Sequence, residues 1–326
     1  MGRSAVALFC FPAGCVFLCC LFFNPLPAND KITSENTPVE QSVYHVTQDC
    51  FWKTYVNKLY TPSGRNILRD SPSDHKHHHA LMFGIILNDI NFWEEFNTEE
   101  YGRQIPQKKT VLSQKNIDFN NSSLLLDYSE EELAWTFPDG SVPAREHRRI
   151  IGWQSKTDPI TFLDWVSELE ITDAYNEILL KGNHYHGLGL RFDASMDKEG
   201  TFISDSATLQ QRIESGTTEH LRGDEYLTSC RWMAYTAQLN GSPVTVAIFD
   251  APENLRPMTA FTMGQEGKTF AYLSATFNLW HEPLLLKQGE HVRFHYGIAL
   301  WDGRRSVEEI ESAYQTWCKI QQFLHL

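Results

Sequence analysis

The chain has 326 residues, of which 42% are hydrophobic, and its net charge is −13. This acidic balance argues against nucleic acids and anionic membranes as partners, since both bind basic surfaces. The 20 Phe, 12 Tyr and 9 Trp residues favour strands, and 19 Gly and 14 Pro residues supply turns, so the composition predicts an antiparallel β protein.

The first 28 residues have the pattern of a secretory signal peptide. Arg3 provides a basic start, residues 5–23 are almost wholly apolar, and Ala28 is a small residue suited to cleavage. The apolar run approaches the length of a membrane span, so a membrane anchor is the main alternative, and Cys15 gives a weak lipoprotein signal. We therefore expect a secreted or periplasmic protein with no membrane span in the mature chain, in which residues 29–42 form a polar linker.

The pattern of residues 43–326 predicts a single β-sandwich domain that is closed by a helix. The Asn240-Gly241 pair is typical of a two-residue hairpin turn. Ser306 and Glu309 form a capping box for a helix over residues 306–324, and the three- and four-residue spacing of its apolar residues predicts that it docks on the sandwich. The predicted strands are 51–60, 81–87, 109–119, 123–128, 132–137, 144–152, 161–172, 176–181, 184–194, 228–240, 244–250, 259–263, 270–277 and 291–300.

Four histidines, His75, His77, His78 and His79, lie just before the apolar run at residues 81–87. If one extended backbone continues through the whole segment, the first, second and fourth of these histidines share a face with the core residues that follow. Imidazoles gain or lose a proton near neutral pH, and at the edge of an apolar face they are typical of a catalytic or metal-binding pocket. The alternative is a solvated histidine-rich turn.

A second predicted strand repeats this arrangement, because His184 and His186 share the parity of the apolar residues that follow them. Gly187, Gly189 and Arg191 fall on the opposite face, where the glycines let backbone or ligand approach closely. If the two histidine-headed strands run in the same direction, their imidazoles meet at one end of the core. If the strands are direct antiparallel neighbours, the imidazoles lie at opposite ends, and the sequence leaves both arrangements open.

Carboxylates that could complete such a site follow the first hairpin. Trp93 precedes Glu94 and Glu95, and on an extended backbone at most one of this pair points inward. A carboxylate beside a histidine can act as a general base or acid, or as a third metal ligand next to two imidazoles. We take Glu95 as this carboxylate.

Arginines could orient an acidic sugar or a similar anion through their planar fork, with Arg103 and Arg191 as the candidates. The charged group at residues 145–149 predicts a salt-bridged surface strand. In the strand at 291–300, His291, Arg293 and His295 share one parity, which predicts a polar outer face.

Several motifs are missing from the sequence: a GxSxG elbow, a phosphate-cradling glycine loop, a dinucleotide fingerprint and HExxH. Their absence argues against a serine hydrolase, a kinase or a nicotinamide enzyme. Beyond the leader, Cys50, Cys230 and Cys318 make at most one disulfide, and no CxxC pair indicates zinc binding or thiol redox chemistry.

Residues 74–79 (DHKHHH) and 88–94 (NDINFWE) resemble the DHPHHR and VNGVDFW signature of the PmoA-like family, a bacterial family of unknown function often labelled "methane oxygenase PmoA". Segments 163–172, 187–192, 246–254 and 289–303 are also similar, while Lys76 and His79 depart from the Pro and Arg that are common in the family. The single N-terminal apolar stretch argues against a methane monooxygenase membrane subunit. The resemblance implies a secreted bacterial protein among carbohydrate-degrading functions, with a supersandwich fold like that of galactose mutarotases and polysaccharide lyases.

The leading hypothesis is a secreted carbohydrate-active enzyme, a lyase, hydrolase or epimerase, that acts on a carbohydrate or another small molecule. One imidazole would move a proton at a sugar carbon or glycosidic oxygen, and a Trp would stack on the sugar ring. The candidate catalytic residues are His75, His77, His78, His79, Glu95 and His186, and the candidate substrate-binding residues are Trp93, Arg103, His184, Arg191 and Trp232.

A variant of this hypothesis places a divalent metal on two histidines and the carboxylate, with His75, His77, His186 and Glu95 as the candidate ligands. The alternatives are a non-catalytic glycan-binding or cell-surface module, in which exposed aromatic residues carry the affinity, and a metal-dependent oxygenase, as the family label suggests.

Overall fold

A computed structural model describes residues 42–119, 122–155, 159–205, 208–257, 259–265 and 270–324. The expected signal peptide and all but the last residue of the expected linker lie outside these ranges. Among the helices that the structure describes, none is long and apolar enough to cross a membrane. Cys50, Cys230 and Cys318 are free thiols.

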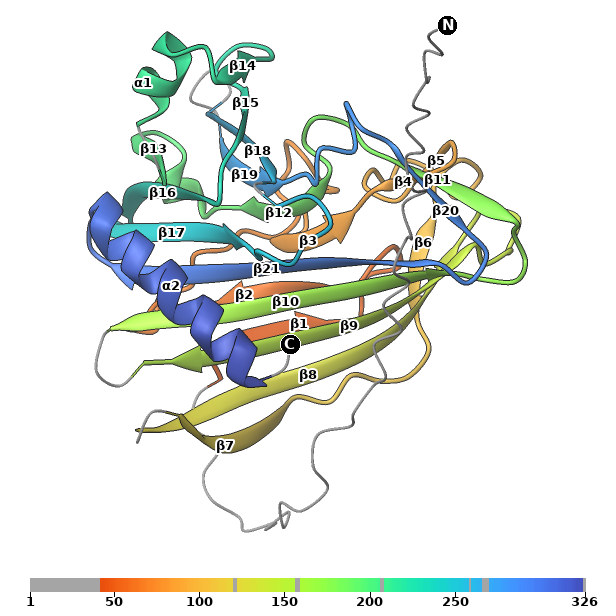
Figure 1. Ribbon diagram of the computed structural model, residues 1–326, viewed down its shortest axis with the longest axis horizontal. Helices are drawn as coiled ribbons and strands as arrows, with labels where there is room; N and C mark the ends of the chain where they lie inside the picture. The colour runs from red at the N-terminus through yellow and green to blue at the C-terminus, as the bar shows by residue number, and fades with distance from the viewer. Residues whose placement is uncertain are drawn as a thin grey trace, which may run out of the picture. The chain divides into compact units, whose positions relative to one another are not determined.

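The described residues form two large sheets and one small sheet (Figure 1). The eight-stranded sheet has the spatial order β1 (Tyr44–Thr47), β2 (Tyr55–Leu59), β3 (Leu81–Gly84), β12 (Gly187–Arg191), β19 (Ala271–Ala275), β18 (Ala260–Gln265), β15 (Tyr226–Ser229) and β14 (Thr218–His220). The nine-stranded sheet has the order β13 (Gly200–Ser204), β16 (Trp232–Leu239), β17 (Ser242–Asp250), β21 (His291–Asp302), β10 (Ile160–Ile171), β9 (Ala144–Gln154), β8 (Ser122–Thr136) and β6 (Arg103–Pro106), with β7 (Ser113–Phe119) also paired to β8.

The small sheet contains β20 (Leu284–Lys287), β11 (Glu177–Lys181), β4 (Ile86–Leu87) and β5 (Ile90–Asn91). The helical elements are the single-turn η1 (Ala194–Met196), the short α1 (Leu209–Glu214) and the long α2 (Val307–Leu324). Neighbouring strands of the three described sheets pair antiparallel throughout. The predicted fold class, a large antiparallel β-sandwich with one C-terminal helix, is confirmed.

The main core lies between the two large sheets. Leu188 and Leu190 on β12 point into it, as the alternation of the strand predicts, and both are fully buried. The ring of Phe83 on β3 lies 5.1 Å from that of Phe294 on β21, so the two sheets are in direct aromatic contact. Burying a side chain of this size contributes about 1.5–3 kcal/mol.

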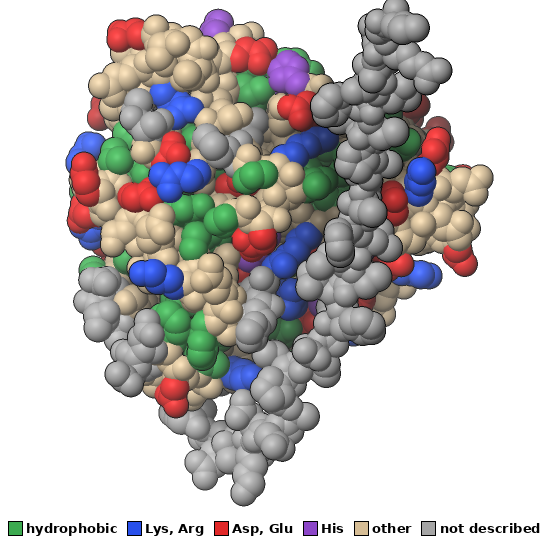
Figure 2. Space-filling view, in the orientation of Figure 1, with side chains coloured by type: hydrophobic (Ala, Val, Ile, Leu, Met, Phe, Trp, Pro, Cys, Tyr) green, Lys and Arg blue, Asp and Glu red, His purple; other side chains and the backbone are tan. Residues whose placement is uncertain are grey.

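A second apolar layer lies between the nine-stranded sheet and α2, which crosses the outer face of that sheet (Figure 1). Trp317 of α2 packs directly on Gly297 of β21, where an added Cβ would lie 2.3 Å from the indole ring. Trp232 belongs to this layer: it is fully buried, and its Nε1 donates to Glu311 of α2 at 2.8 Å. The prediction that Trp232 stacks on a ligand is therefore wrong. Charged side chains of both signs are interspersed with apolar ones over the face on which α2 lies (Figure 2).

The hairpin predicted at Asn240-Gly241 is confirmed. Both residues have positive φ angles, 50° and 83°, and the flanking Leu239 and Ser242 are paired across β16 and β17. Asn and Gly tolerate this left-handed backbone, which is why the pair specifies a tight two-residue turn.

Candidate functional site

The histidine-rich segment forms tight turns and is not a strand. The His75 backbone N–H donates to the Pro72 carbonyl oxygen, and the His78 N–H donates to the His75 carbonyl oxygen, both at 3.0 Å. An extended backbone from His75 onward, one of the two arrangements considered from the sequence, is therefore not formed, and β3 starts at Leu81, where the strand was predicted to start. The physical reason is turn chemistry, because Pro72 and the Ser and Asp residues around it favour local hydrogen bonds over an extended ladder.

These turns stack three imidazoles, which we call the histidine stack: His75, His77 and His78. The ring of His75 lies on that of His78 with centroids 4.6 Å apart, and His77 meets His78 edge-on at 4.7 Å. His78 in turn stacks on Tyr272 of β19 at 5.7 Å. His78 is buried, whereas His75 and His77 remain partly exposed, so the stack runs from the surface down to the eight-stranded sheet.

Gly189 on β12 forms the floor beneath this site. A Cβ built there would lie 2.4 Å from the hydroxyl of Tyr272 and 2.6 Å from the ring of Trp93. The close approach that the sequence predicted over this glycine therefore occurs, and aromatic side chains make it. β12 pairs with β3 through Gly189 and Met82, so the floor lies where the two histidine-headed segments enter the same sheet.

Replacing Gly189 by alanine should destabilise the protein by about 1–3 kcal/mol, because the added methyl must displace Tyr272 or Trp93. Urea unfolding followed by far-UV circular dichroism measures this loss. Tyr272→Phe removes the hydroxyl, which is the atom nearest to the added methyl. The double variant should therefore lose less stability than the sum of the losses of the two single variants. A Gly189→Ala protein as stable as the wild type would contradict this close packing.

Trp93 joins the two groups of histidines. β3 and β12 are direct antiparallel neighbours, and this arrangement was expected to place the two groups of imidazoles at opposite ends of the core. Both strands are short, so the distance between their ends is small and Trp93 contacts both groups. The Trp93 ring lies flat against His186 at 5.4 Å and meets His78 edge-on at 6.2 Å. Trp93 is fully buried, so it organises the site and the prediction that it stacks on a sugar ring is wrong.

Glu94, and not Glu95, is the carboxylate that faces His186. One Glu94 oxygen accepts a hydrogen bond from the Tyr185 hydroxyl at 2.7 Å and lies 3.6 Å from His186 Nε2. The Asn91 side-chain amide donates to the other oxygen. Because Glu94 and Glu95 leave the chain in opposite directions, Glu95 turns away to Lys53 and His79.

The imidazoles of His77, His78 and His186 are uncharged at neutral pH. Burial lowers the pKa of His186, and it lowers the pKa of His78 well below its usual range. Burial also lowers the pKa of the more exposed His77 to about 4. Burial alone would raise the pKa of Glu94, but its interactions with His186 and the Tyr185 hydroxyl lower it to about 2. The Glu94 and His186 pair is therefore a carboxylate beside a neutral imidazole.

Several buried polar atoms here have no hydrogen-bond partner among the described residues. They are Nδ1 of His78, both ring nitrogens of His186, Nε1 of Trp93, and Nε and Nη1 of Arg191. An unsatisfied buried polar atom costs about 1–3 kcal/mol, so a set of them at one place is unusual in a purely structural region. Such atoms are suited to contact a polar ligand.

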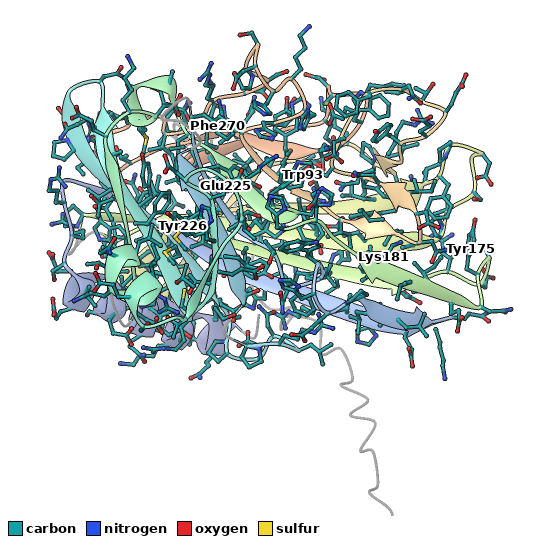
Figure 3. The ribbon with its side chains drawn as sticks, turned by 90° about the horizontal axis from the view of Figure 1, so that it is seen from above. Trp93, Tyr175, Lys181, Glu225, Tyr226 and Phe270 are labelled. Atoms are coloured by element: carbon teal, nitrogen blue, oxygen red, sulfur yellow. The ribbon has the colours of Figure 1, made fainter. Side chains whose placement is uncertain are left out.

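Arg191 completes the site beside the histidine stack. Its guanidinium donates to Asp74 at 2.8 Å and lies 4.1 Å above the ring of Phe270, which also contacts His75 at 4.8 Å. The sequence predicted that Arg191 lies on the face of its strand opposite to His184 and His186. The turns before β3 nevertheless place the histidine stack on the same side of the sheet as Arg191. Trp93 and Phe270 are labelled in Figure 3, which looks onto the molecule from above.

His79 departs from the stack and belongs to a second polar group with Glu95, Cys50, Lys53 and Asp70. Its Nδ1 lies 2.9 Å from Asp70, and its Nε2 lies 2.9 Å from Glu95 and 3.6 Å from the Cys50 sulfur. Burial alone would lower the pKa of His79, but hydrogen bonds to Asp70, Cys50 and Glu95 raise it to about 11. The Lys53 ammonium contacts Glu95 at 2.9 Å and donates to the Trp93 carbonyl oxygen, which places this group next to the first.

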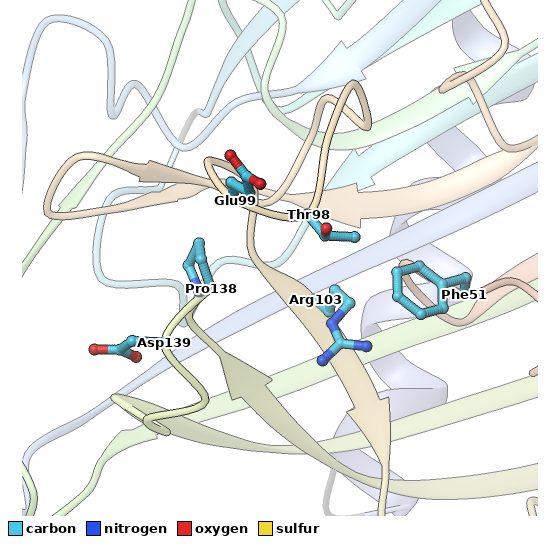
Figure 4. Close-up of a pocket in the computed structure, with 6 residues that line it drawn as sticks. All are labelled: Phe51, Thr98, Glu99, Arg103, Pro138 and Asp139. Carbon is cyan, nitrogen blue, oxygen red and sulfur yellow. The ribbon is translucent and has the colours of Figure 1, made fainter.

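Two of the predicted substrate-binding residues lie in other surroundings. His184 contacts Glu225 at 3.3 Å and the exposed Trp280 at 5.3 Å. Arg103 faces Phe51 at 4.6 Å in an open pocket of about 650 Å³ (Figure 4). The other residues lining this pocket are Thr98, Glu99, Pro138 and Asp139, and none of them is a histidine.

The predicted metal set is wrong in its membership. Of the candidate ligands His75, His77, His186 and Glu95, the carboxylate of Glu95 does not join the histidines, because it turns away to Lys53 and His79. Among the described residues, the group with ligand atoms within 4.8 Å of one another is Cys50, His79 and Glu95.

Sequence reasoning missed Cys50, Lys53, Tyr185, Tyr272 and the role of Glu94. The adjacency of Glu94 to Glu95 did indicate that only one of them would face the histidines. Cys50 and Lys53 carry no such signal, because they approach His79 and Glu95 only through the folding of the segment before β2.

Fold and site together define an antiparallel β-sandwich with a histidine-rich polar site on the outer face of its eight-stranded sheet. The chain belongs to the family described as "Family of unknown function (DUF6807)", whose model matches residues 31–315. The resemblance to the PmoA-like family stays a prediction. No curated protein matches the sequence.

Three solved structures with broad similarity are the GH36 α-galactosidase AgaA of Geobacillus stearothermophilus, the galactosidase domain of the α-galactosidase-sucrose kinase AgaSK, and a galactose mutarotase related enzyme of Lactobacillus acidophilus. Each has 9% identity, with TM-scores of 0.41, 0.41 and 0.32. The matches cover 69%, 74% and 82% of this chain, and 30%, 32% and 98% of the other chains. The chain thus spans about a third of each galactosidase chain, and activity has to be argued from the site itself.

Proposed function

We propose that this protein is a secreted or periplasmic carbohydrate-active enzyme whose site moves a proton on its substrate. The observation that carries the proposal is convergence: imidazoles from two distant segments, His77 and His78 before β3 and His186 before β12, gather around Trp93 and Glu94. Uncharged imidazoles beside a carboxylate are suited to accept a proton and return it.

In this proposal His77 is the group that meets the substrate. It is partly exposed, uncharged at neutral pH, and contacts the exposed ring of Phe96 at 5.7 Å. The apolar ring of Phe96 offers a surface against which a sugar can pack. Arg191, with two unpartnered guanidinium nitrogens among the described residues, supports recognition of an acidic sugar.

The site favours proton transfer, as in an epimerase or a lyase, over glycoside hydrolysis. Hydrolysis usually needs one protonated and one ionised carboxyl group flanking the glycosidic bond. The pKa of Glu94 is lowered to about 2, and the pKa of Glu95 is lowered by Lys53 and His79 against the opposing effect of burial, so neither is held protonated.

Incubating the protein with neutral and acidic sugars in D2O and recording proton NMR spectra tests the proposal. We expect deuterium at a sugar carbon, a new isomer or an unsaturated product with at least one sugar class. His77→Asn and His186→Asn should each lower the rate by about 10²–10⁴-fold. His147→Asn, which alters a partly exposed histidine of β9 that pairs with Glu130, should leave the rate unchanged.

If no sugar is turned over and the His77→Asn protein still binds glycans as the wild type does, the protein is a non-catalytic glycan-binding module. Hydrolysis products without exchange or isomerisation would also contradict the proton-transfer mechanism.

The rate should also depend on pH in one direction. If His77 accepts the proton, it must be uncharged, and with its pKa lowered to about 4 it is uncharged above that pH. We therefore expect kcat/KM to rise as the pH passes through about 4 and then to stay level up to neutral pH. An inflection near the ordinary histidine pKa of about 6.5 would contradict this role for His77.

A further inference from the structure

We propose that Cys50, His79 and Glu95 form a binding site for a divalent cation of the zinc class. This site shares no ligand with the proposed proton-transfer site and does not depend on it. One thiol, one imidazole and one carboxylate are all established zinc ligands, and the sulfur favours zinc over Mg²⁺ or Ca²⁺.

The distances between the three ligand atoms fit a tetrahedral ion. With Zn–N and Zn–S distances of roughly 2.0–2.3 Å, a nitrogen and a sulfur on one tetrahedral ion lie about 3.6 Å apart, and a nitrogen and an oxygen about 3.4 Å apart. His79 Nε2 lies 3.6 Å from the Cys50 sulfur and 2.9 Å from Glu95 Oε2. The three ligand atoms all lie within 4.8 Å of one another, so a shift of the Glu95 carboxylate away from His79 Nε2 is the adjustment that one ion bound by all three requires.

The surroundings of His79 are those of a metal-binding histidine. Asp70 lies 2.9 Å from Nδ1 and leaves Nε2 directed at Cys50 and Glu95, and the ring is stacked on Tyr55 at 4.5 Å. A carboxylate behind the ligating imidazole fixes its orientation and strengthens the metal site. The Tyr55 hydroxyl donates to Asp70 at 2.8 Å, so this carboxylate is itself held in place.

The local charges accommodate a dication. Lys53 occupies only Oε1 of Glu95, at 2.9 Å, and leaves Oε2 facing His79 and Cys50. Binding forms bonds from the ion to sulfur, nitrogen and oxygen and releases the protons carried by the thiol and the imidazole. Two protons leave as two positive charges arrive, so the net charge of the group is unchanged.

The same residues favour a metal site over a cysteine nucleophile. In a nucleophilic pair, the imidazole would be directed at the sulfur alone. Here Glu95 Oε2 lies closer to Nε2 than the sulfur does, at 2.9 Å against 3.6 Å. Three protein ligands leave a fourth position for water, as in zinc sites open to exchange.

Titration of the reduced chain with Co²⁺, carried out without a histidine tag, tests the proposal by absorption. We expect one equivalent of Co²⁺ to produce a sulfur-to-metal charge-transfer band in the near ultraviolet, and Zn²⁺ to abolish it. Cys50→Ser should remove the band, while Cys318→Ser, which changes another partly buried thiol, should keep it. His77→Asn should also keep it, which separates this site from the histidine stack.

Affinity and stability give two further measurements. Asp70→Asn should weaken Zn²⁺ binding by about 10–100-fold, as expected for a residue that orients a ligand. Zn²⁺ should raise the Tm of the wild type and not that of Cys50→Ser or His79→Gln, whose folding without metal is checked by circular dichroism. Absence of the band in the wild type, an undiminished band in Cys50→Ser, or equal Zn²⁺ stabilisation of all variants would overturn the proposal.

Discussion

Replacing Asp164 by alanine should destabilise the protein by about 3–5 kcal/mol, which is among the largest single-residue effects expected here. Asp164 on β10 is fully buried and accepts hydrogen bonds from His295 of β21 at 3.0 Å and from Trp317 and Gln321 of α2 at 2.9 and 2.7 Å. The change leaves these donors without their shared acceptor under the helix. Urea unfolding at constant pH measures the loss.

Two variants serve as controls for this prediction. Asp164→Asn keeps the shape and one acceptor oxygen, so its loss should lie between those of wild type and alanine. Glu168→Ala, on the same strand but facing the partly exposed Arg149, should cost no more than about 1 kcal/mol. An Asp164→Ala protein within 1 kcal/mol of the wild type would show that α2 is held by its apolar layer alone.

The contribution of His295 should depend on pH. Burial alone would lower its pKa, but Asp164 and Glu253 raise it above its ordinary value, while Arg293 opposes this. A raised pKa stabilises the fold fully below the unfolded value of about 6.5, and this stabilisation is lost as pH rises through the folded pKa. Burial alone would raise the pKa of Glu253, but its interaction with His295 lowers it, so the stabilisation that Glu253 contributes is lost as the pH falls. The stability difference between wild type and His295→Asn should therefore be largest near pH 5–6 and shrink above about 6.5.

The alternation of side chains made most strands predictable. The sequence predicts a strand at 161–172 and the structure has β10 at Ile160–Ile171, because Leu163, Trp165 and Leu169 alternate into the main core and polar turn residues follow the strand. The capping box at Ser306 and Glu309 likewise marked the start of α2 correctly. Local chemistry determines these features, so they need no knowledge of distant partners.

Buried charges were the main source of error. The predicted break between strands 123–128 and 132–137 falls on Ser129, Glu130 and Glu131, yet β8 runs unbroken because Glu131 points inward to Arg148. The polar parity of β21 was predicted to face solvent, and His291 is exposed, but α2 covers the strand at His295 and buries that residue. In both places the partner comes from a distant segment, and periodicity within one strand cannot reveal it.

The candidate site was predictable in composition but not in geometry. The two histidine groups were both visible in the sequence, and they do meet at Trp93. The histidines of the first group reach Trp93 because two turns at residues 72–78 position them, and not because they share one face of a strand. Turns orient side chains without a fixed period. Residue spacing could therefore not predict that His75 stacks on His78, or that Glu94 and not Glu95 faces His186.

Replacing Arg148 by methionine should destabilise the protein by about 3–5 kcal/mol, because it leaves buried carboxylates without their cation. Arg148 on β9 is fully buried between the sheets, where its guanidinium donates to Glu146 at 2.7 and 2.9 Å and lies 4.7 Å from the ring of Trp165. It also donates to Thr54 before β2, at 2.8 Å, so it connects β9 to the first strands of the chain. The group at 145–149 is thus only partly the surface strand that the sequence predicted.

The comparison with Arg148→Lys isolates geometry from charge, because lysine keeps the cation but cannot donate two parallel hydrogen bonds to Glu146. We expect an intermediate loss of stability for lysine. The double variant Arg148→Met with Glu146→Gln removes the unpaired charge and should be more stable than Arg148→Met alone. His147→Asn changes the neighbouring outward-facing residue and should have little effect. Equal stability of the methionine and lysine variants would mean that a buried positive charge without the paired hydrogen bonds to Glu146 gives no stability. Recovery in the double variant would identify the unpaired Glu146 carboxylate as the cause of the loss.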